Sequence, residues 1–414
     1  MRKHGPPPTP EENILLRLLR DEPLAGALER CSKEELFKQA VKHKVLAPLA
    51  VRLEGEAAVE PSWRRWALFA SMSSERDARL WSGGAEKTVK LLESSAISPV
   101  MLKGPSLALG RPRDMGDIDL LVPRDSLVKA ISVLEAEGYE YKGFERNMYI
   151  RRNEYRDWDK LARWSNQFEF REPETGALIE LHTAFFETER VYREDLSRFR
   201  EAVDEFIAHR VKDPETGYFF LSLEDRILLL ALHAGLKRSP ANHSFILRHL
   251  FDFKHLAAEG PDWDRLEQRA FRFGGAHHLL FLLRLYEAFA PPCVPEGFIG
   301  RIESKLSRPV AGLQNIHLRC LSGLDSYNRR SVFTYQLLLP YVLKGTPRAL
   351  VQSLLVFPLL FPSIIRLSRY YGLPQRSRLA FLLYLLEPLR WTLRIFRKIA
   401  KGGRERQPRP QARP

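Results

Sequence analysis

The sequence predicts an α+β fold, in which a small mixed sheet with flanking helices is embedded between N-terminal and C-terminal helical regions. Three observations along the 414 residues predict it. Apolar residues recur at helical spacing over residues 10–95, and again from 223 to about 290. Between them, residues 96–190 hold short apolar runs of strand length. A chain of this length has room for two or three structural units.

The helical periodicity of the first part is clearest in residues 14–19, 36–49 and 63–92, where helix breakers are sparse. The pattern changes at residues 96–104, a short apolar run closed by Gly104, which predicts a buried strand ending in a tight turn. A second strand is expected at 118–122, where Pro123 stops it. We therefore expect a helical region followed by a sheet.

The next segments complete the predicted sheet. Residues 126–137 have helical periodicity, and Gly138 supplies a C-terminal stop. Residues 167–171 and 177–182 flank the turn sequence Pro-Glu-Thr-Gly at 173–176, which predicts a β-hairpin. The resulting expected division is an N-terminal helical region (1–95), an α+β core (96–210), a helical domain (211–330), a basic amphipathic helical extension (331–401) and a disordered tail (402–414).

Three acidic residues carry the predicted chemistry. Asp117 and Asp119 are two positions apart at a strand, so their carboxylates are expected on one face. Glu180 lies in another predicted strand between apolar neighbours. If these strands pair, three carboxylates converge, which is a common way to hold Mg²⁺ for phosphoryl or nucleotidyl transfer. Taken alone, an Asp-x-Asp at a strand start is more often a solvated edge or a helix cap.

The conjunction of these motifs resembles the nucleotidyltransferase superfamily typified by DNA polymerase beta and kanamycin nucleotidyltransferase. It is still more similar to a bacterial family of uncharacterised nucleotidyltransferases, commonly associated with polysaccharide-biosynthesis loci. The similar segments are Leu-Lys-Gly at 102–104, Gly-Asp-Ile-Asp-Leu-Leu-Val at 116–122 and Glu-Leu-His at 180–182. The resemblance covers about residues 10–290, and it includes helical segments on both sides of the expected sheet.

The resemblance implies Mg²⁺-dependent transfer of a nucleoside monophosphate from a nucleoside triphosphate (NTP) to a hydroxyl-bearing acceptor. The expected metal-binding and catalytic residues are Asp117, Asp119 and Glu180. The expected contacts to the triphosphate and its pyrophosphate leaving group are Lys103, Gly104, Ser106, Arg111 and Arg113. Pro105 follows Gly104 where the superfamily usually has a second glycine or a serine, and it removes one backbone donor.

Other polar residues in apolar surroundings are expected to be structural. His182 and His233 each lie within an apolar run, so we interpret them as buried histidines that are hydrogen-bonded to the backbone, in preference to a catalytic acid or base. Asp252 and the Asp-Trp-Asp sequence at 262–264 are interpreted as residues that cap or brace helices.

The net charge of +14 belongs mostly to the C-terminal part of the chain. Residues 341–414 carry 15 Lys and Arg against two Asp and Glu, which leaves the first 340 residues nearly neutral. Within 389–401, basic residues and apolar residues form two neighbouring stripes of one predicted helix. This pattern indicates either an anionic membrane surface as a partner or a solvated helix packed on the body. It does not favour nucleic acid as the partner, because aromatic residues are few on the basic face.

Three cysteines far apart in the sequence argue against a zinc site or a disulfide framework. The start of the chain has no apolar segment of secretory type, and the uncharged run 349–365 contains two prolines. We expect a cytoplasmic protein, peripheral on the inner face of the membrane if the basic helix binds lipid. The alternative function is a catalytically weak or inactive member that acts as a membrane-surface partner in polysaccharide or peptide assembly.

Overall fold

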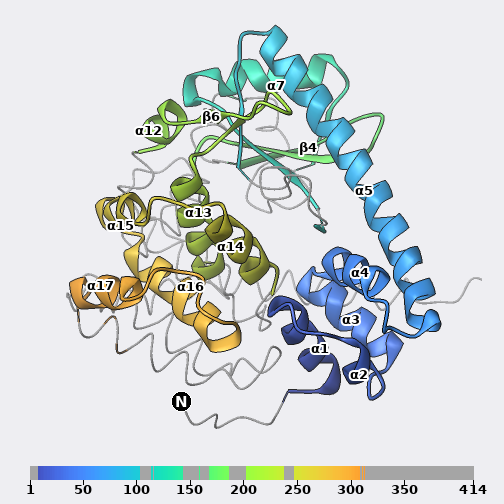
Figure 1. Cartoon of the computed structure of the whole chain (residues 1–414). Helices are drawn as coiled ribbons and strands as arrows, with labels where there is room; N and C mark the ends of the chain where they lie inside the picture. The colour runs from blue at the N-terminus through green and yellow to red at the C-terminus, as the bar shows by residue number, and fades with distance from the viewer. Residues whose placement is uncertain are drawn as a thin grey trace, which may run out of the picture.

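The computed structural model describes residues 8–102, 113–114, 116–142, 158, 167–185, 202–236, 247–307, 310 and 312. In this part of the chain, a sheet flanked by helices occupies one side of the molecule and two groups of helices occupy the other (Figure 1). The predicted α+β class with a mixed sheet is confirmed. No helix in the described ranges combines the length and the apolar composition needed to cross a membrane.

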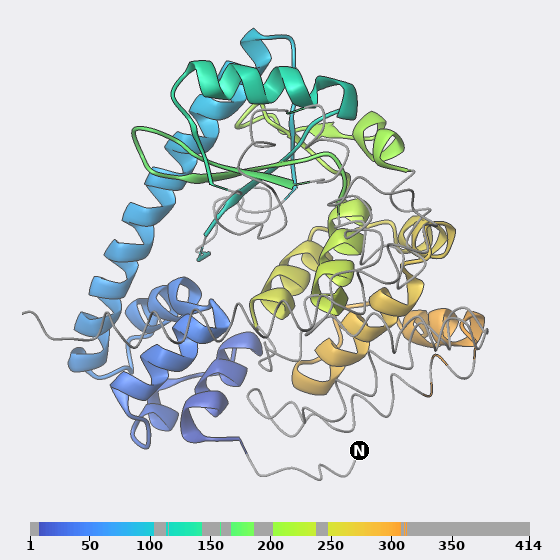
Figure 2. The ribbon, with the colours of Figure 1, turned by 180° about the vertical axis from the view of Figure 1, so that it is seen from behind.

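The N-terminal region is helical, as predicted. Its helices are α1 (Pro10–Leu19), α2 (Ala25–Leu28), α3 (Lys33–His43), α4 (Leu46–Gly55) and α5 (Pro61–Ser94). Thr9 and Glu12 form a capping box that fixes the start of α1. The long helix α5 runs from the N-terminal helices to the sheet (Figures 1 and 2). Its first part, around Trp63, packs in one hydrophobic core, and its last part, around Val89, packs in a second core.

The end of α5 explains why the first strand is shorter than predicted. Ala96 has a φ of 57°, the Ala96 N–H donates to the Glu93 carbonyl, and the Ile97 N–H donates to the Leu92 carbonyl. This pattern is a Schellman motif, which satisfies the last carbonyls of a helix. The start of the apolar run 96–104 therefore terminates α5, and strand β1 comprises Val100–Met101.

Seven strands of the described residues form one sheet in the order β3-β4-β5-β2-β1-β7-β6. The predicted hairpin is confirmed, since β4 and β5 pair antiparallel and Gly176 takes a left-handed conformation in their turn. Strands β2 and β5 pair in parallel, and so do β1 and β7. The strands are β1 (Val100–Met101), β2 (Ile118–Leu121), β3 (Glu140–Tyr141), β4 (Gln167–Arg171), β5 (Leu178–His182), β6 (Val211–Lys212) and β7 (Phe219–Phe220).

The two faces of the sheet have different partners. Ile118 and Leu120 of β2 face the core that α5 and α7 (Leu127–Ala136) cover, with the short 3₁₀ turn η1 (Arg124–Ser126) before α7. Leu121 belongs to the other core, which it shares with the C-terminal helices. Because side chains alternate along a strand, Asp119 lies on the same face as Leu121. The polar residue of β2, Asp119, therefore lies on the face of the sheet opposite the core that α7 covers.

The C-terminal helices pack beneath this second face. They are α13 (Leu223–Leu236), α14 (Arg248–Ala258), α15 (Trp263–Arg272), α16 (Ala276–Phe289) and α17 (Phe298–Lys305), and the short helix α12 (Val203–Ala208) precedes them. Leu228, Phe253 and Phe281, from three of these helices, are almost fully buried in one core. The described parts of the long helical pattern of residues 223–290, which are 223–236 and 247–290, thus contain four helices.

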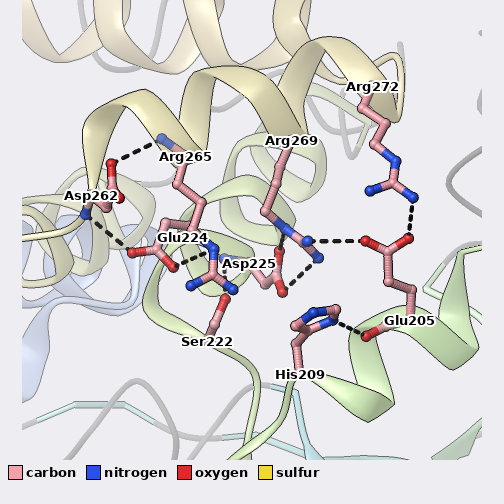
Figure 3. Close-up of polar contacts among 9 residues, drawn as sticks. All are labelled: Glu205, His209, Ser222, Glu224, Asp225, Asp262, Arg265, Arg269 and Arg272. Carbon is pink, nitrogen blue, oxygen red and sulfur yellow. Dashed lines mark hydrogen bonds and ion pairs between the residues drawn. The ribbon is translucent and has the colours of Figure 1, made fainter.

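Charged residues join three of these helices (Figure 3). Arg269 of α15 makes a bidentate ion pair with Asp225 of α13, which is fully buried, and it also contacts Glu205 of α12. Asp262 accepts a hydrogen bond from the Arg265 N–H at 3.0 Å and so caps α15, as predicted. These contacts fix the orientation of the helical half.

Several sequence predictions fall outside the described residues. They concern the glycine-turn residues Lys103, Gly104 and Ser106, the upstream Arg111, and the basic C-terminal segment 341–401 with its uncharged run 349–365.

Candidate active site

The pairing of β2 with β5 brings two of the predicted acidic residues together. Asp119 and Glu180 are direct partners in the parallel register of these strands. His182 is two residues beyond Glu180, so its side chain lies on the same face of the sheet. Asp119 has no exposed surface, and Glu180 and His182 are 7% and 5% exposed. The sheet therefore gathers three ionisable side chains in a place nearly closed to solvent.

The ligand atoms of these three residues form one tight group. One carboxylate oxygen of Asp119, one of Glu180 and one ring nitrogen of His182 all lie within 4.8 Å of one another. The His182 Nε2 atom is 2.8 Å from Asp119 Oδ1 and 3.4 Å from Glu180 Oε2. We call Asp119, Glu180 and His182 the carboxylate–histidine group.

Strand β4 adds a second layer of polar side chains. Gln167 donates a hydrogen bond from Nε2 to Glu180 Oε2. Glu169 is the direct partner of Glu180 in the antiparallel register, and it is only 7% exposed. Three acidic positions, Glu169, Glu180 and Asp119, thus follow one another across β4, β5 and β2. So many buried carboxylates repel one another unless positive charge lies among them.

The carboxylate–histidine group fits a divalent cation. Carboxylate oxygens are the ligands that Mg²⁺ prefers, and Asp119 and Glu180 each direct one toward a common point. An imidazole can ligate a transition metal, or it can donate a hydrogen bond that orients a ligating carboxylate. The 2.8 Å contact between His182 and Asp119 favours the orienting role when Mg²⁺ is the cation. His182 was expected to bond to the backbone, and the contact to Asp119 shows that its partners include a candidate ligand.

The remaining predicted ligand, Asp117, immediately precedes β2 and is half-buried. Among the described residues it is not part of the group whose ligand atoms lie within 4.8 Å. Its neighbour Gly116 lies near the Lys44 ammonium, since a Cβ built on Gly116 would be 3.8 Å from Lys44 Nζ. The pKa of Lys44 is lowered by partial desolvation and then by the charge of Arg248, while Asp117 acts in the opposite direction.

Arg113 is the predicted phosphate contact that the structure describes. It is buried, and its Nε and Nη2 atoms donate to the two carboxylate oxygens of Asp252 at 3.0 and 3.1 Å. Burial alone would lower the pKa of Arg113, but Asp252, Asp117 and Asp119 together raise it. Asp252 was expected to cap or brace a helix; it braces α14 against the segment that leads into β2.

The segment before β2 is also attached to the N-terminal helices. Asp114 accepts hydrogen bonds from the Leu46 N–H at 2.7 Å and the Ala47 N–H at 3.3 Å. These donors belong to the first turn of α4, where backbone N–H groups lack helical partners. Arg113, Asp114 and Asp117 therefore stand where the sheet, the N-terminal helices and the C-terminal helices meet.

Sequence reasoning missed three residues of this site. His182 was set aside as structural, although its i, i+2 spacing from Glu180 already places both side chains on one face. For Glu169, the alternation of side chains in the predicted hairpin could have placed its carboxylate on the same face. For Arg248, the sequence offers no such signal, because only the folded structure places α14 beside Arg113. His233 was expected to be buried, and it is; its Nδ1 lies 3.1 Å from His249 Nε2.

Comparisons with known proteins identify a family. No curated protein and no solved structure matches the chain. The family described as uncharacterised nucleotidyltransferase matches residues 31–291, which is more than half of the chain and includes β2, β5 and α14. With that match over the strands that carry the carboxylate–histidine group, the chain belongs to the family of uncharacterised nucleotidyltransferases and is a transferase.

Proposed function

We propose that this protein transfers a nucleoside monophosphate from an NTP to a hydroxyl-bearing acceptor, with Mg²⁺ bound at the carboxylate–histidine group. The observation that carries the proposal is the β2–β5 register, which sets Asp119 beside Glu180 with His182 in contact with both. Family membership supports an NTP as substrate. A buried acidic group of this kind suits a divalent cation, which nucleotidyl transfer generally requires.

In this proposal Asp119 and Glu180 are the inner metal ligands, and Asp117 completes the set from the start of β2. When bound there, Mg²⁺ supplies charge neutralisation to the triphosphate and to the transition state. Asp119 is held in place by its backbone as well, since its carbonyl accepts a hydrogen bond from the Leu102 N–H at 3.0 Å. A metal ligand whose backbone and side chain are both held in place needs little reorganisation during the reaction.

His182 and Gln167 have positioning roles in the same proposal. His182 keeps an Asp119 oxygen in a fixed direction, and Gln167 does so for Glu180. Glu180 is also the candidate for accepting the proton of the acceptor hydroxyl, because it is the group member whose side chain retains the largest exposed fraction, 10%. Lys103, Gly104, Ser106 and Arg111 remain the proposed triphosphate contacts, while Arg113 contributes positive charge that Asp252 balances.

The acceptor and the place of action belong to the proposal too. A saccharide or lipid-linked saccharide is the acceptor class that the resemblance suggests. The basic stripe of residues 389–401 would hold the enzyme at an anionic membrane surface, with about 1 kcal/mol for each basic residue near the lipid. Flotation with anionic liposomes tests this point: the full chain floats, and replacing Arg390, Arg394 and Arg397 by Gln reduces flotation. Equal flotation contradicts it.

The experiment for the activity uses α-labelled NTPs, Mg²⁺ and a lysate of the host, with label transfer followed by mass spectrometry. The wild-type chain should label an acceptor, and Asp119→Asn should abolish labelling because it removes one metal ligand charge at constant volume. Asp264→Asn is the matched control, since the Asp264 side chain is exposed on α15. Unchanged labelling by Asp119→Asn would reject the proposed site. Absence of labelling with all four NTPs would favour a catalytically inactive partner protein.

A further inference from the structure

Arg248 is a buried arginine that forms no ion pair with the described residues. It is 8% exposed, and in the described part of the chain its guanidinium makes no hydrogen bond or ion pair; the Nε atom is fully enclosed. Buried charges are normally paired, because an unpaired one loses its hydration without compensation. An arginine cannot escape this cost by losing its proton at neutral pH. The Arg248 side chain therefore carries a positive charge that no hydrogen bond or ion pair from the described residues compensates.

Its surroundings increase the excess of positive charge. Arg248 lines a small pocket with Arg113, Asp252, His249 and Leu102. The only carboxylate among these lining residues is Asp252, and both of its oxygens are taken by Arg113. Burial and then the charge of Arg113 lower the pKa of Arg248, whereas Asp252, Asp117 and Asp119 act against this. These groups are thus close enough for their charges to influence one another.

The backbone at this point also favours an anion. Arg248 is the first residue of α14, an 11-residue helix whose N-cap, Leu247, provides no side-chain hydrogen bond. The first turn of α14 contains no acidic residue. The N-terminus of a helix carries partial positive charge and prefers anions, so an arginine there is unfavourable unless a negative group is added. The N-terminus of α14 and the Arg248 side chain therefore both favour binding of an anion.

The pocket adjoins the carboxylate–histidine group. Leu102 lines the pocket, and its N–H donates to the Asp119 carbonyl at 3.0 Å. A ligand in the pocket therefore lies next to the strand that bears the proposed metal ligand. A cation bound by Asp119 would also reduce the negative charge that now partly offsets Arg248, which would strengthen the need for an anion.

We propose that Arg248, at the start of α14 and beside Arg113, forms a phosphate-binding site that the C-terminal helices contribute next to the carboxylate–histidine group. Guanidinium groups bind phosphate oxygens through paired N–H donors, which suits this site. The phosphate comes from the triphosphate of the NTP or from a phosphate on the acceptor. The assignment of the phosphate to the NTP or to the acceptor rests on the proposed function, whereas the anion site itself does not.

The test is calorimetric titration of the full chain with inorganic pyrophosphate in EDTA. Wild-type protein should bind it, and Arg248→Met should bind it at least tenfold more weakly. Arg248→Lys, which keeps the charge without the fork of donors, should lie between them. Arg284→Met is the matched control and should bind as wild type, because Arg284 lies on α16 and pairs with Glu287 and Glu303.

A stability measurement separates binding from a structural role. Without ligand, Arg248→Met should unfold at the same temperature as wild type or a higher one, because it removes an uncompensated buried charge. Pyrophosphate should raise the melting temperature of wild type more than that of Arg248→Met. Equal pyrophosphate affinity of wild type and Arg248→Met, no binding by wild type, or a large loss of stability in the ligand-free variant would each overturn the proposal.

Competition identifies the source of the phosphate. With excess Mg²⁺, a non-hydrolysable NTP analogue should displace pyrophosphate if the site holds the triphosphate; simultaneous binding assigns it to the acceptor. Both results support the phosphate site.

The proposed function can fail independently of the phosphate site. If Asp119→Asn keeps label transfer while Arg248→Met loses pyrophosphate binding, the proposed metal site is wrong and the phosphate site stands. The reverse pattern rejects the phosphate site alone.

Discussion

His182 and Asp119 lie on neighbouring parallel strands, and the His182 Nε2 atom is 2.8 Å from Asp119 Oδ1. Neither side chain is more than slightly exposed. Because the contact is made across the strand pair, the orientation of the candidate metal ligand depends on the register of the sheet.

Replacing His182 should weaken metal binding without unfolding the protein. Partners that orient a ligand typically contribute about 10- to 100-fold to metal affinity. His182→Ala should therefore bind Mn²⁺ more weakly than His182→Gln, whose amide N–H can still donate to Asp119. Titration of both variants, followed by electron paramagnetic resonance, checks this order. Affinities equal to that of wild type in both variants would show that His182 does not orient the ligand.

Two adjacent glycines of α5 should respond in opposite ways to alanine. A Cβ on Gly84 would lie 2.7 Å from Ala177 Cβ, near the β4–β5 turn, whereas a Cβ on Gly83 would meet nothing within 4 Å. Gly84→Ala should destabilise the protein by about 1–3 kcal/mol through overpacking. Gly83→Ala should stabilise it by up to about 1 kcal/mol through helix propensity. Urea unfolding measures both, and equal effects would contradict the packing of α5 on the hairpin.

The ion pairs of Figure 3 predict a contrast between two arginines of α15. Arg269→Met leaves the fully buried Asp225 carboxylate without its partner, which should cost about 3–5 kcal/mol of unfolding free energy. Arg272→Met removes an ion pair to Glu205 from a side chain that is 64% exposed, and it should cost less than about 1 kcal/mol. Denaturant unfolding measures the free energy of unfolding of the two variants. Similar losses would mean that the buried Arg269–Asp225 pair does not stabilise the packing of α15 on α13.

Asp114 should give a pH-dependent contribution to stability. Burial raises the pKa of its carboxyl above the ordinary value of 3.8, against the hydrogen bonds from Leu46 and Ala47. The folded state then binds the proton more strongly than the unfolded state, so this contribution is present below pH 3.8 and is lost as the pH rises through the folded pKa. Asn at this position has no titratable proton and keeps one acceptor oxygen for these N–H groups.

The unfolding free energy of wild type minus that of Asp114→Asn should therefore be smaller at pH 7 than at pH 4. Urea unfolding at both pH values supplies the comparison. A difference that does not change, or that grows with pH, would contradict the burial of the Asp114 charge.

The fold class and much of the site were predictable because they depend on local patterns. The alternation around Asp119 and Glu180 predicted strands with inward carboxylates, and the Pro-Glu-Thr-Gly turn predicted the hairpin. The first strand was wrong at its start, since Ala96 adopts a left-handed conformation without being glycine. Sequence rules assign that role to glycine, so the strand was placed from residue 96, although the predicted helical region ending at residue 95 agrees with the end of α5 at Ser94.

The parts that sequence could not predict depend on contacts between distant segments. Strand β7 is only two residues long, and it is defined by pairing with β1 about 120 residues earlier in the chain. The ion pair between Arg113 and Asp252 joins residues 139 positions apart. Arg248 becomes notable only when it is seen buried beside that pair. The five-part domain division and the roles of the glycine-turn residues stay predictions.

The most direct test of the central claim is the affinity of the full chain for Mn²⁺, measured by electron paramagnetic resonance without nucleotide or acceptor. Wild type should bind the ion, and Asp119→Asn and Glu180→Gln should each weaken binding more than about tenfold. Both variants should keep the wild-type circular dichroism spectrum. Mn²⁺ binding by folded Asp119→Asn and Glu180→Gln that equals wild-type binding would contradict the claim.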